Sequence, residues 1–345
     1  MNVRRIAPAL LAGALVFPVG SWAALDPIPT TSGWSGSFIL GAGWTEVESN
    51  LIAGNDFADV GKKQVDTIFD GPESEDDVLP VFSGDIRYTF GSSQTQLFFG
   101  SDVTDLVRFD FANLLGVRKQ FDGVGIISGA FALSNFPAEV WEDPYLAGVN
   151  RNKTDRDSNG FRFDWSRILD SNFSFKINYR DIDVDKERSG SDPALGLTDQ
   201  QRRLLRRDGD NTTYNLEYLW KIGPRQVLIP EIFLTQQDRD GDAVTNDIVG
   251  GNLTYSYLGD VWTFVLTGSL AGSEYDKRNP IYNEKADEDI YSLGATAFYK
   301  LPTKSKRWSL LGSVAYADSD SDIEFHDTTI LLITAGVRYR FGQQL

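Results

Sequence analysis

The 345-residue sequence contains no cysteine and a single histidine, His326. Without cysteine the chain forms no disulfide and no Cys-ligated zinc site. A Ser–His or Cys–His catalytic site needs its histidine held rigidly against a nucleophile, whereas Asp327 and Thr328 beside His326 predict a solvated loop. The sequence has no glycine-rich phosphate loop and no HExxH motif. We therefore expect no enzyme, cofactor or metal site; the abundant acids leave a carboxylate-only hydrolase as the alternative.

Basic residues are in the minority, because 33 Lys and Arg face 49 Asp and Glu, for a formal net charge of −16. Nucleic-acid-binding domains carry the opposite excess, so we expect no nucleic-acid partner. The acids gather at residues 70–77 and 238–242. Solvated loops are the simpler interpretation of both stretches, with divalent-cation binding as the alternative. Residues 238–242 lack the ligand spacing and final Glu of an EF-hand loop.

Long apolar runs are scarce in the sequence, and the only prominent one spans residues 6–19. It follows Arg4 and Arg5 and precedes the small-x-small triplet Ser21-Trp22-Ala23. The run is too short for a spanning helix, which needs about 20 residues. Its flanks match a secretory signal peptide. We predict cleavage near Ala23, with residues 1–23 as signal peptide and residues 24–345 as one exported domain in a Gram-negative outer membrane.

Aromatic residues and glycine are plentiful, with 8 Trp, 13 Tyr, 22 Phe and 32 Gly, yet the mean hydropathy is only −0.27. A transmembrane β-barrel reconciles the two, because it exposes every second residue to lipid and keeps its average hydropathy low. Trp and Tyr then collect at the two membrane interfaces. The composition therefore favours a barrel over a helical membrane protein.

Residues 328–341 show the period-two pattern most clearly. One face is wholly apolar and ends in Tyr339 and Phe341; the other ends in Arg338 and Arg340. This alternation predicts a strand with unlike faces, longer than the roughly 5–6 residues usual in globular proteins. The stretch resembles the terminal strand of Gram-negative outer-membrane barrels, although four residues follow Phe341. We expect lipid, lipopolysaccharide and the barrel-assembly machinery as partners.

The same pattern predicts thirteen further strands. They fall near residues 34–46, 80–90, 95–102, 106–121, 123–134, 160–168, 173–183, 212–221, 227–236, 248–258, 261–271, 290–300 and 308–317. Long and short connections alternate between them, and the rhythm is broken only at residues 103–105. Outer-membrane barrels have long extracellular loops and short periplasmic turns. We predict an all-β fold: a transmembrane antiparallel barrel of about 14 strands, with 12 as the alternative.

The strand faces opposite the aromatic residues carry charge, which toward lipid would cost roughly 2–4 kcal/mol for a midplane Arg. Two interpretations remain open: the charges pair and stiffen the wall, or an Arg-rich lumen selects solutes. Fourteen strands lie nearer the open barrels of 16–18 strands than the filled ones of about 8. We predict a porin-like channel for small polar solutes, with anions among them; the alternative is a non-conducting receptor, adhesin or structural barrel. The lumen-lining candidates are Arg87, Arg108, Asp110, Arg118, Arg162, Asp164, Lys176, Arg180, Glu217, Glu231, Arg338 and Arg340.

Residues 197–207 predict a short helix that begins with a Thr198–Gln201 capping box. Its four arginines, Arg202, Arg203, Arg206 and Arg207, could attract anions or contact lipopolysaccharide phosphates. The alternative is an exposed amphipathic helix packed by its two leucines.

Several short stretches together resemble a family of Gram-negative outer-membrane proteins of unknown function. In order they are residues 32–36, 40–43, 141–145, 150–151, 154–156, 187–190, 207–210 and 279–280. The resemblance implies an outer-membrane barrel and supplies no activity. Because binding residues tend to lie on loops, Trp141, Asp143 and Tyr145 are further binding candidates; the alternative is a loop folded onto the barrel rim.

Overall fold

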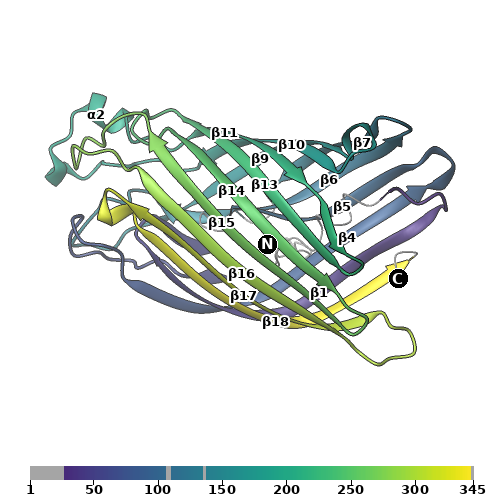
Figure 1. Cartoon of the computed structure of the whole chain (residues 1–345). Helices are drawn as coiled ribbons and strands as arrows, with labels where there is room; N and C mark the ends of the chain where they lie inside the picture. Colours follow the sequence, from purple (N-terminus) through teal and green to yellow (C-terminus); the bar gives the residue numbers. More distant parts are fainter. Residues whose placement is uncertain (1–26, 106–109, 135–136, 343–345) are drawn as a thin grey trace, which may run out of the picture.

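The computed structural model describes residues 27–105, 110–134 and 137–342, with no side chains described for residues 102–111. The chain forms one antiparallel sheet that closes as a transmembrane barrel of fourteen strands (Figure 1), as predicted. The ring closes where β1 pairs with both β18 and β4. Its strands are β1 (Gly33–Ser49), β4 (Ser74–Phe90), β5 (Thr95–Asp105), β6 (Asp110–Phe121), β7 (Gly125–Leu133), β9 (Lys153–Ser166), β10 (Phe173–Val184), the consecutive segments β11 (Gly209–Tyr218) and β12 (Trp220–Gly223), β13 (Gln226–Arg239), β14 (Asn246–Leu258), β15 (Trp262–Tyr275), β16 (Glu288–Lys300), β17 (Trp308–Ser321) and β18 (Thr328–Gly342).

Three short strands lie outside this ring. Strand β8 (Ala138–Trp141) pairs with β9 beyond the end of β7, and β2 (Ile52–Asn55) adds to β8. Strand β3 (Ala58–Asp59) forms a small hairpin with β2. The remaining elements are the helix α2 (Asp199–Arg203) and the 3-10 turns η1 (Gly91–Ser93), η2 (Ile168–Asp170), η3 (Pro193–Leu195) and η4 (Glu324–His326). No helix among the described residues is long and apolar enough to cross a membrane.

Most strands are longer than predicted. The predicted polar segment 47–79 is partly strand, because β1 continues to Ser49 and pairs Glu46 with Asp76 in β4. Strand β9 begins at Lys153 rather than at Gly160. Residues 103–105, predicted as a link, belong to β5. These segments have polar residues on both faces, so they lack the apolar alternation by which strands are recognised.

The outer face of the barrel is apolar and the inner face is not. Trp34, Leu40, Phe131, Ile232 and Leu293 are each more than 60% exposed on the outer face. Aromatic pairs lie near the strand ends, such as Trp262 with Tyr299 and Trp308 with Tyr339. At the closing seam Gly41 lies opposite Gly336, and a Cβ on Gly41 would meet the Ala335 carbonyl oxygen at 2.2 Å. Glycine there lets the first and last strands approach.

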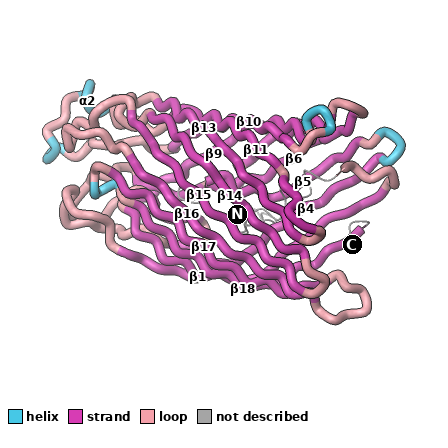
Figure 2. The backbone as a smooth tube through the Cα atoms, viewed as in Figure 1, coloured by secondary structure: helices cyan, strands magenta, loops and turns pink. Residues whose placement is uncertain are grey.

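The connections sort onto two ends of the barrel (Figure 2). At what we call the loop end lie residues 50–73, 137–152, 185–208, 240–245, 276–287 and 322–327. At the opposite turn end lie residues 91–94, 122–124, 167–172, 224–225, 259–261 and 301–307. Helix α2 lies at the loop end, at the left of Figure 1.

Candidate functional site: the charged interior wall and the loop cap

The interior wall formed by β9, β10, β11 and β13 carries a charge-balanced cluster, in which Arg162, Lys176 and Arg180 match Asp164, Glu217 and Glu231 in number. The Lys176 Nζ atom lies 2.7 Å from Glu217 Oε2 and 3.7 Å from Glu231 Oε2. Glu231 also accepts hydrogen bonds from Asn215 and Asn252 through their Nδ2 atoms. A buried and a half-buried carboxylate thus share one ammonium group, and two neutral amides donate to the other oxygen of Glu231. This arrangement joins neighbouring strands through side chains as well as through the backbone.

Three more of the predicted arginines have partners on their own wall. Arg162 Nε donates to Asp164 Oδ1 at 3.0 Å, and Arg87 Nε lies 2.9 Å from Asp85 Oδ2. Arg118 Nε donates to the buried amide oxygen of Gln96 at 2.7 Å. These contacts match the interpretation in which the interior charges pair and stiffen the wall.

Arg338 and Arg340 on β18 differ from the rest. Neither guanidinium makes an ion pair within the described part of the chain, and the Nε atom of each is buried without a hydrogen-bond partner. The Arg338 guanidinium carbon lies 3.7 Å from the centre of the Phe298 ring, so a cation–π contact takes the place of a carboxylate. Arg338 is only 5% exposed. The interior therefore has a balanced wall and a wall with excess positive charge.

The remaining lumen-lining candidates are placed as follows. Arg180 is buried on the interior face of β10. Arg108 lies outside the described residues, and Asp110 begins β6 without a described side chain. The interior is also partly apolar, because Ile39, Val81, Phe298 and Leu311 pack together on it. Sequence alternation had marked the charged positions, but not this apolar patch between them.

The connections at the loop end fold together into a compact layer, which we call the loop cap. All six contribute to one apolar cluster, so they are packed against each other rather than extended into solvent. Its buried members are Val65, Ile68, Tyr145, Leu205, Ala243, Tyr275, Ala286, Ile323 and Phe325. Residues far apart in sequence meet here, which single-strand alternation does not predict.

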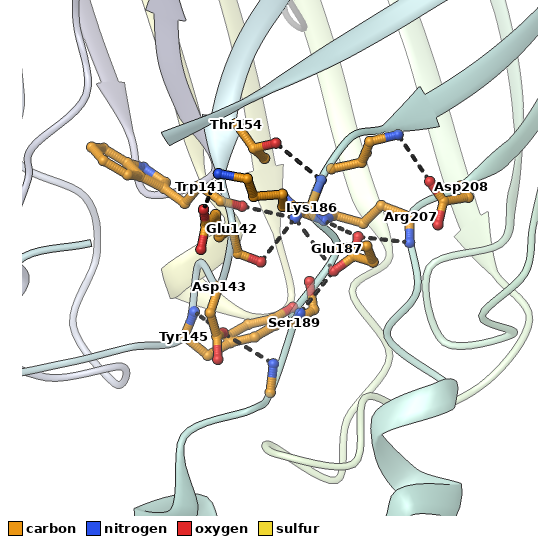
Figure 3. A network of polar contacts seen from close by, with 12 residues as sticks. Trp141, Glu142, Asp143, Tyr145, Thr154, Lys186, Glu187, Ser189, Arg207 and Asp208 are labelled. Carbon is orange, nitrogen blue, oxygen red and sulfur yellow. Dashed lines mark hydrogen bonds and ion pairs between the residues drawn. The ribbon is translucent and has the colours of Figure 1, made fainter. Parts of the chain in front are cut away.

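A polar network holds residues 141–145 to residues 187–207 within the loop cap (Figure 3). The carboxylate of Asp143 accepts hydrogen bonds from the backbone N–H groups of Gly190, Ser191 and Asp192. Arg207 donates through Nε to Glu187 and through Nη2 to the Trp141 carbonyl, both at 2.7 Å. A carboxylate that accepts three backbone bonds fixes the course of a loop.

Trp141, Asp143 and Tyr145 are thus interior parts of the loop cap. Trp141 is fully buried, and the Arg151 guanidinium carbon lies 4.3 Å from the centre of its ring. Arg151 Nη1 donates to the carbonyls of Asn50 and Pro144. These contacts match the alternative of a loop folded onto the barrel rim, since a ligand would reach Trp141 only after the loop cap rearranged.

The four loop arginines do not act together. The predicted capping box is confirmed, with Thr198 as N-cap and both reciprocal bonds to Gln201 present, although α2 ends at Arg203. Arg202 pairs with Asp199 and Arg207 turns inward to Glu187. Arg203 and Arg206 are exposed. Leu205 is buried in the apolar cluster, as the amphipathic-helix alternative requires.

His326 was wrongly predicted to be solvated, since it is only 5% exposed. Its Nε2 atom lies 3.1 Å from the Tyr145 hydroxyl, which accepts a hydrogen bond from Asn279 Nδ2. Burial lowers the pKa of His326 to about 4, which keeps the ring neutral. The polar residues after it suggested exposure, whereas the apolar Ile323 and Phe325 just before it were the signal for burial.

The acidic stretches are engaged within the fold. Asp76 accepts a hydrogen bond from Trp44 Nε1, and Asp77 accepts one from the Asp59 backbone N–H. In the second stretch, Asp242 pairs with Lys277 at 2.5 Å. Among the described residues no group of three or more His, Cys, Asp or Glu side chains is arranged to hold a metal ion.

The model of the family described as "Protein of unknown function (DUF2860)" matches residues 33–340. No curated protein sequence matches the chain. Among solved structures, a Pseudomonas aeruginosa FadL homologue is similar at 12% identity and a TM-score of 0.45, over 90% of each chain. The channel DcaP of Acinetobacter baumannii matches at 9% identity and 0.39, over 90% of this chain and 98% of that one. A BenF-like porin from Pseudomonas fluorescens Pf-5 matches at 9% identity and a TM-score of 0.35, over 89% of this chain and 99% of that one. These values are too low to support any inference about solutes.

Proposed function

Because the chain belongs to DUF2860, a family described only as proteins of unknown function, we propose its role from its own geometry: a porin-like outer-membrane channel for small polar solutes. The observation that carries this proposal is the closed barrel of fourteen strands with an apolar outer face and a charged, hydrogen-bonded inner face. Side chains that face a water-filled lumen retain their charge, whereas lipid disfavours it. A barrel of this size has room for a passage.

The proposal includes the route to the membrane. Residues 1–23 serve as a signal peptide cleaved near Ala23, and the barrel-assembly machinery inserts the remaining chain. The loop end faces outward, toward lipopolysaccharide, and the turn end faces the periplasm. Exposed Arg203 and Arg206 are then available to lipopolysaccharide phosphates. The barrel acts as a passage and not as an enzyme.

The loop cap controls access in this proposal. Its apolar cluster and the Asp143 and Arg207 networks hold the six connections together across the loop end. A solute entering from outside passes between these connections, so their packing sets the conductance. The same packing favours a second candidate, a non-conducting surface protein whose folded cap presents a receptor or adhesin surface.

Single-channel conductance in planar bilayers tests the two candidates. The refolded wild type is compared with a variant in which a short Gly-Ser linker replaces residues 186–207. That segment contains Leu205 of the apolar cluster and Arg207 of the polar network. We expect discrete steps from the wild type and larger steps from the variant. A matched control shortens the turn 302–306 at the opposite end and should leave the step size unchanged.

The outcomes separate cleanly when folding is checked first. Both proteins should show the heat-modifiable gel mobility of folded barrels. If both are folded and neither conducts, the channel is refuted and the surface-protein candidate takes its place. Conductance that is equal in the two proteins would retain the channel and remove the loop cap from control of it.

A further inference from the structure

We propose that Arg338 and Arg340 form a docking site for an oxyanion group, such as phosphate or carboxylate, on the interior wall toward the turn end. The two residues are separated by one position on β18, so their side chains share the inner face. Arg338 lies opposite Ile39 of β1 and Ser309 of β17, and Arg340 lies opposite Ser37. Two guanidinium groups therefore lie two residues apart on the inner face of one strand and project into the same part of the interior.

Among the described side chains, positive charges outnumber carboxylates around this pair. Lys300 of β16 lies opposite Ser309, and Arg87 of β4 is two strands away on the other side. Asp85 is a carboxylate on this wall, and it is already engaged by Arg87 Nε and by the Ser37 hydroxyl at 2.8 Å. Lys176 on the balanced wall, by contrast, pairs with two carboxylates. The electrostatic potential at Arg338 and Arg340 therefore favours an anion more than the potential at the balanced wall does.

The Arg338 side chain is held ready for such a group. The Phe298 ring is fully buried and lies against the guanidinium carbon at 3.7 Å. A stacked ring fixes the guanidinium plane while its N–H edge stays directed to the side. The Nε atoms of both arginines are buried without a partner among the described residues. Arginine binds oxyanions through two parallel N–H bonds, and lysine does not. The chemistry of the site thus selects an oxyanion over chloride.

This inference rests on the proposed function for the delivery of the solute, but the binding itself is measured without conduction. Isothermal titration of the refolded protein in detergent would use inorganic phosphate, acetate and chloride as probes. We expect phosphate and acetate to bind more tightly than chloride. The Arg338→Gln/Arg340→Gln variant should lose at least tenfold in affinity for both oxyanions. Arg118→Gln is the matched control, because it removes an interior arginine that bonds to Gln96, and it should bind as the wild type does.

Two further variants keep the test decisive if the double variant does not fold. Arg340→Gln changes the less buried arginine alone, and Arg338→Lys keeps the charge but loses the fork of N–H donors. Both should weaken oxyanion binding while gel mobility reports a folded barrel. Equal affinity for chloride and phosphate, or unchanged binding in every folded variant, would overturn the site. Oxyanion binding by a protein that does not conduct would retain the site and refute the channel.

Discussion

The Tyr145 side chain connects three segments of the loop cap. Its hydroxyl accepts from Asn279 and lies within hydrogen-bond distance of His326 Nε2, and its ring lies 5.8 Å from that of Phe325. Since the asparagine amide is the donor on one side, the tyrosine proton is free to point at the histidine. His326 then accepts through Nε2 and is neutral. Protonation would remove this acceptor and place a charge among aromatic rings.

This chemistry predicts that acid loosens the loop cap. The folded pKa of His326, about 4, is below the value of 6.5 for an unperturbed histidine. Between pH 4 and pH 6.5 the unfolded state therefore binds more protons at His326 than the folded state does. The stabilising contribution of neutral His326 is complete above about pH 6.5 and falls as the pH drops toward 4. The free energy of unfolding then decreases by up to about 1.4 kcal/mol per pH unit. Hydrogen exchange of residues 276–287 and 322–327 should report it.

The His326→Gln variant is the control, because it keeps a hydrogen-bonding side chain and does not titrate. Desolvation raises the pKa of the adjacent Asp327. A carboxyl group with a raised pKa contributes stability at low pH that is lost as the pH rises, which is opposite to the effect of His326. The His326→Gln variant retains this contribution of Asp327. If wild type and His326→Gln showed the same pH dependence of exchange between pH 4 and 6.5, His326 would not be the group responsible.

At the scale of elements, side chains couple the strands of the balanced wall. Lys176 on β10 bridges Glu217 on β11 and Glu231 on β13. The Lys176→Met variant would remove the ammonium partner of the buried Glu217 and the half-buried Glu231. Removing one partner of a buried ion pair typically costs about 3–5 kcal/mol. Urea unfolding in detergent should show the loss. Adding Glu217→Gln and Glu231→Gln to the variant removes the buried charge and should restore much of the stability; a triple variant as unstable as the single one would contradict this.

Strand β18 closes the barrel, and its last aromatic residue faces outward. The Phe341 ring stacks on Phe38 of β1 at 5.6 Å, across the seam between the first and last strands. The Phe341→Asp variant places a charge on the lipid face and removes this contact, so we expect a clearly lower yield of folded barrel in membranes. Phe341→Leu keeps the face apolar and should insert nearly as well as the wild type. Equal membrane yields for Asp and Phe would show that this position does not support closure.

Alternation along single strands was enough to predict the barrel. The charged positions Arg162, Lys176 and Glu217 were assigned to one face because neighbours two residues away share it. Their partners could not be predicted, since pairing depends on strand register and on distances between separate strands. For the same reason the sequence did not show that Arg338 makes no ion pair with any described residue. The burial of His326 was missed because the connections that cover it come from distant parts of the chain.

At the scale of the whole molecule, the two ends of the barrel are built differently. The loop end carries the apolar cluster, whereas the turn end has short connections such as residues 122–124. Between them, one interior wall is charge-balanced and the other, toward the turn end, carries Arg338 and Arg340. A solute entering at the loop end would meet the loop cap first and the basic pair later. The orientation of the barrel in the membrane therefore decides whether extracellular or periplasmic solutes meet the loop cap first.

The absence of cysteine allows this orientation to be tested with single introduced thiols. Ala194→Cys places one on an exposed residue of the loop cap, and Ser305→Cys places one on an exposed residue of the turn end. If the loop end faces outward, a membrane-impermeant maleimide added to intact cells should label Ala194→Cys only. Ser305→Cys should become labelled after the outer membrane is permeabilised. The cysteine-free wild type measures background. Labelling of Ser305→Cys but not Ala194→Cys in intact cells would reverse the orientation, so that periplasmic solutes would meet the loop cap first.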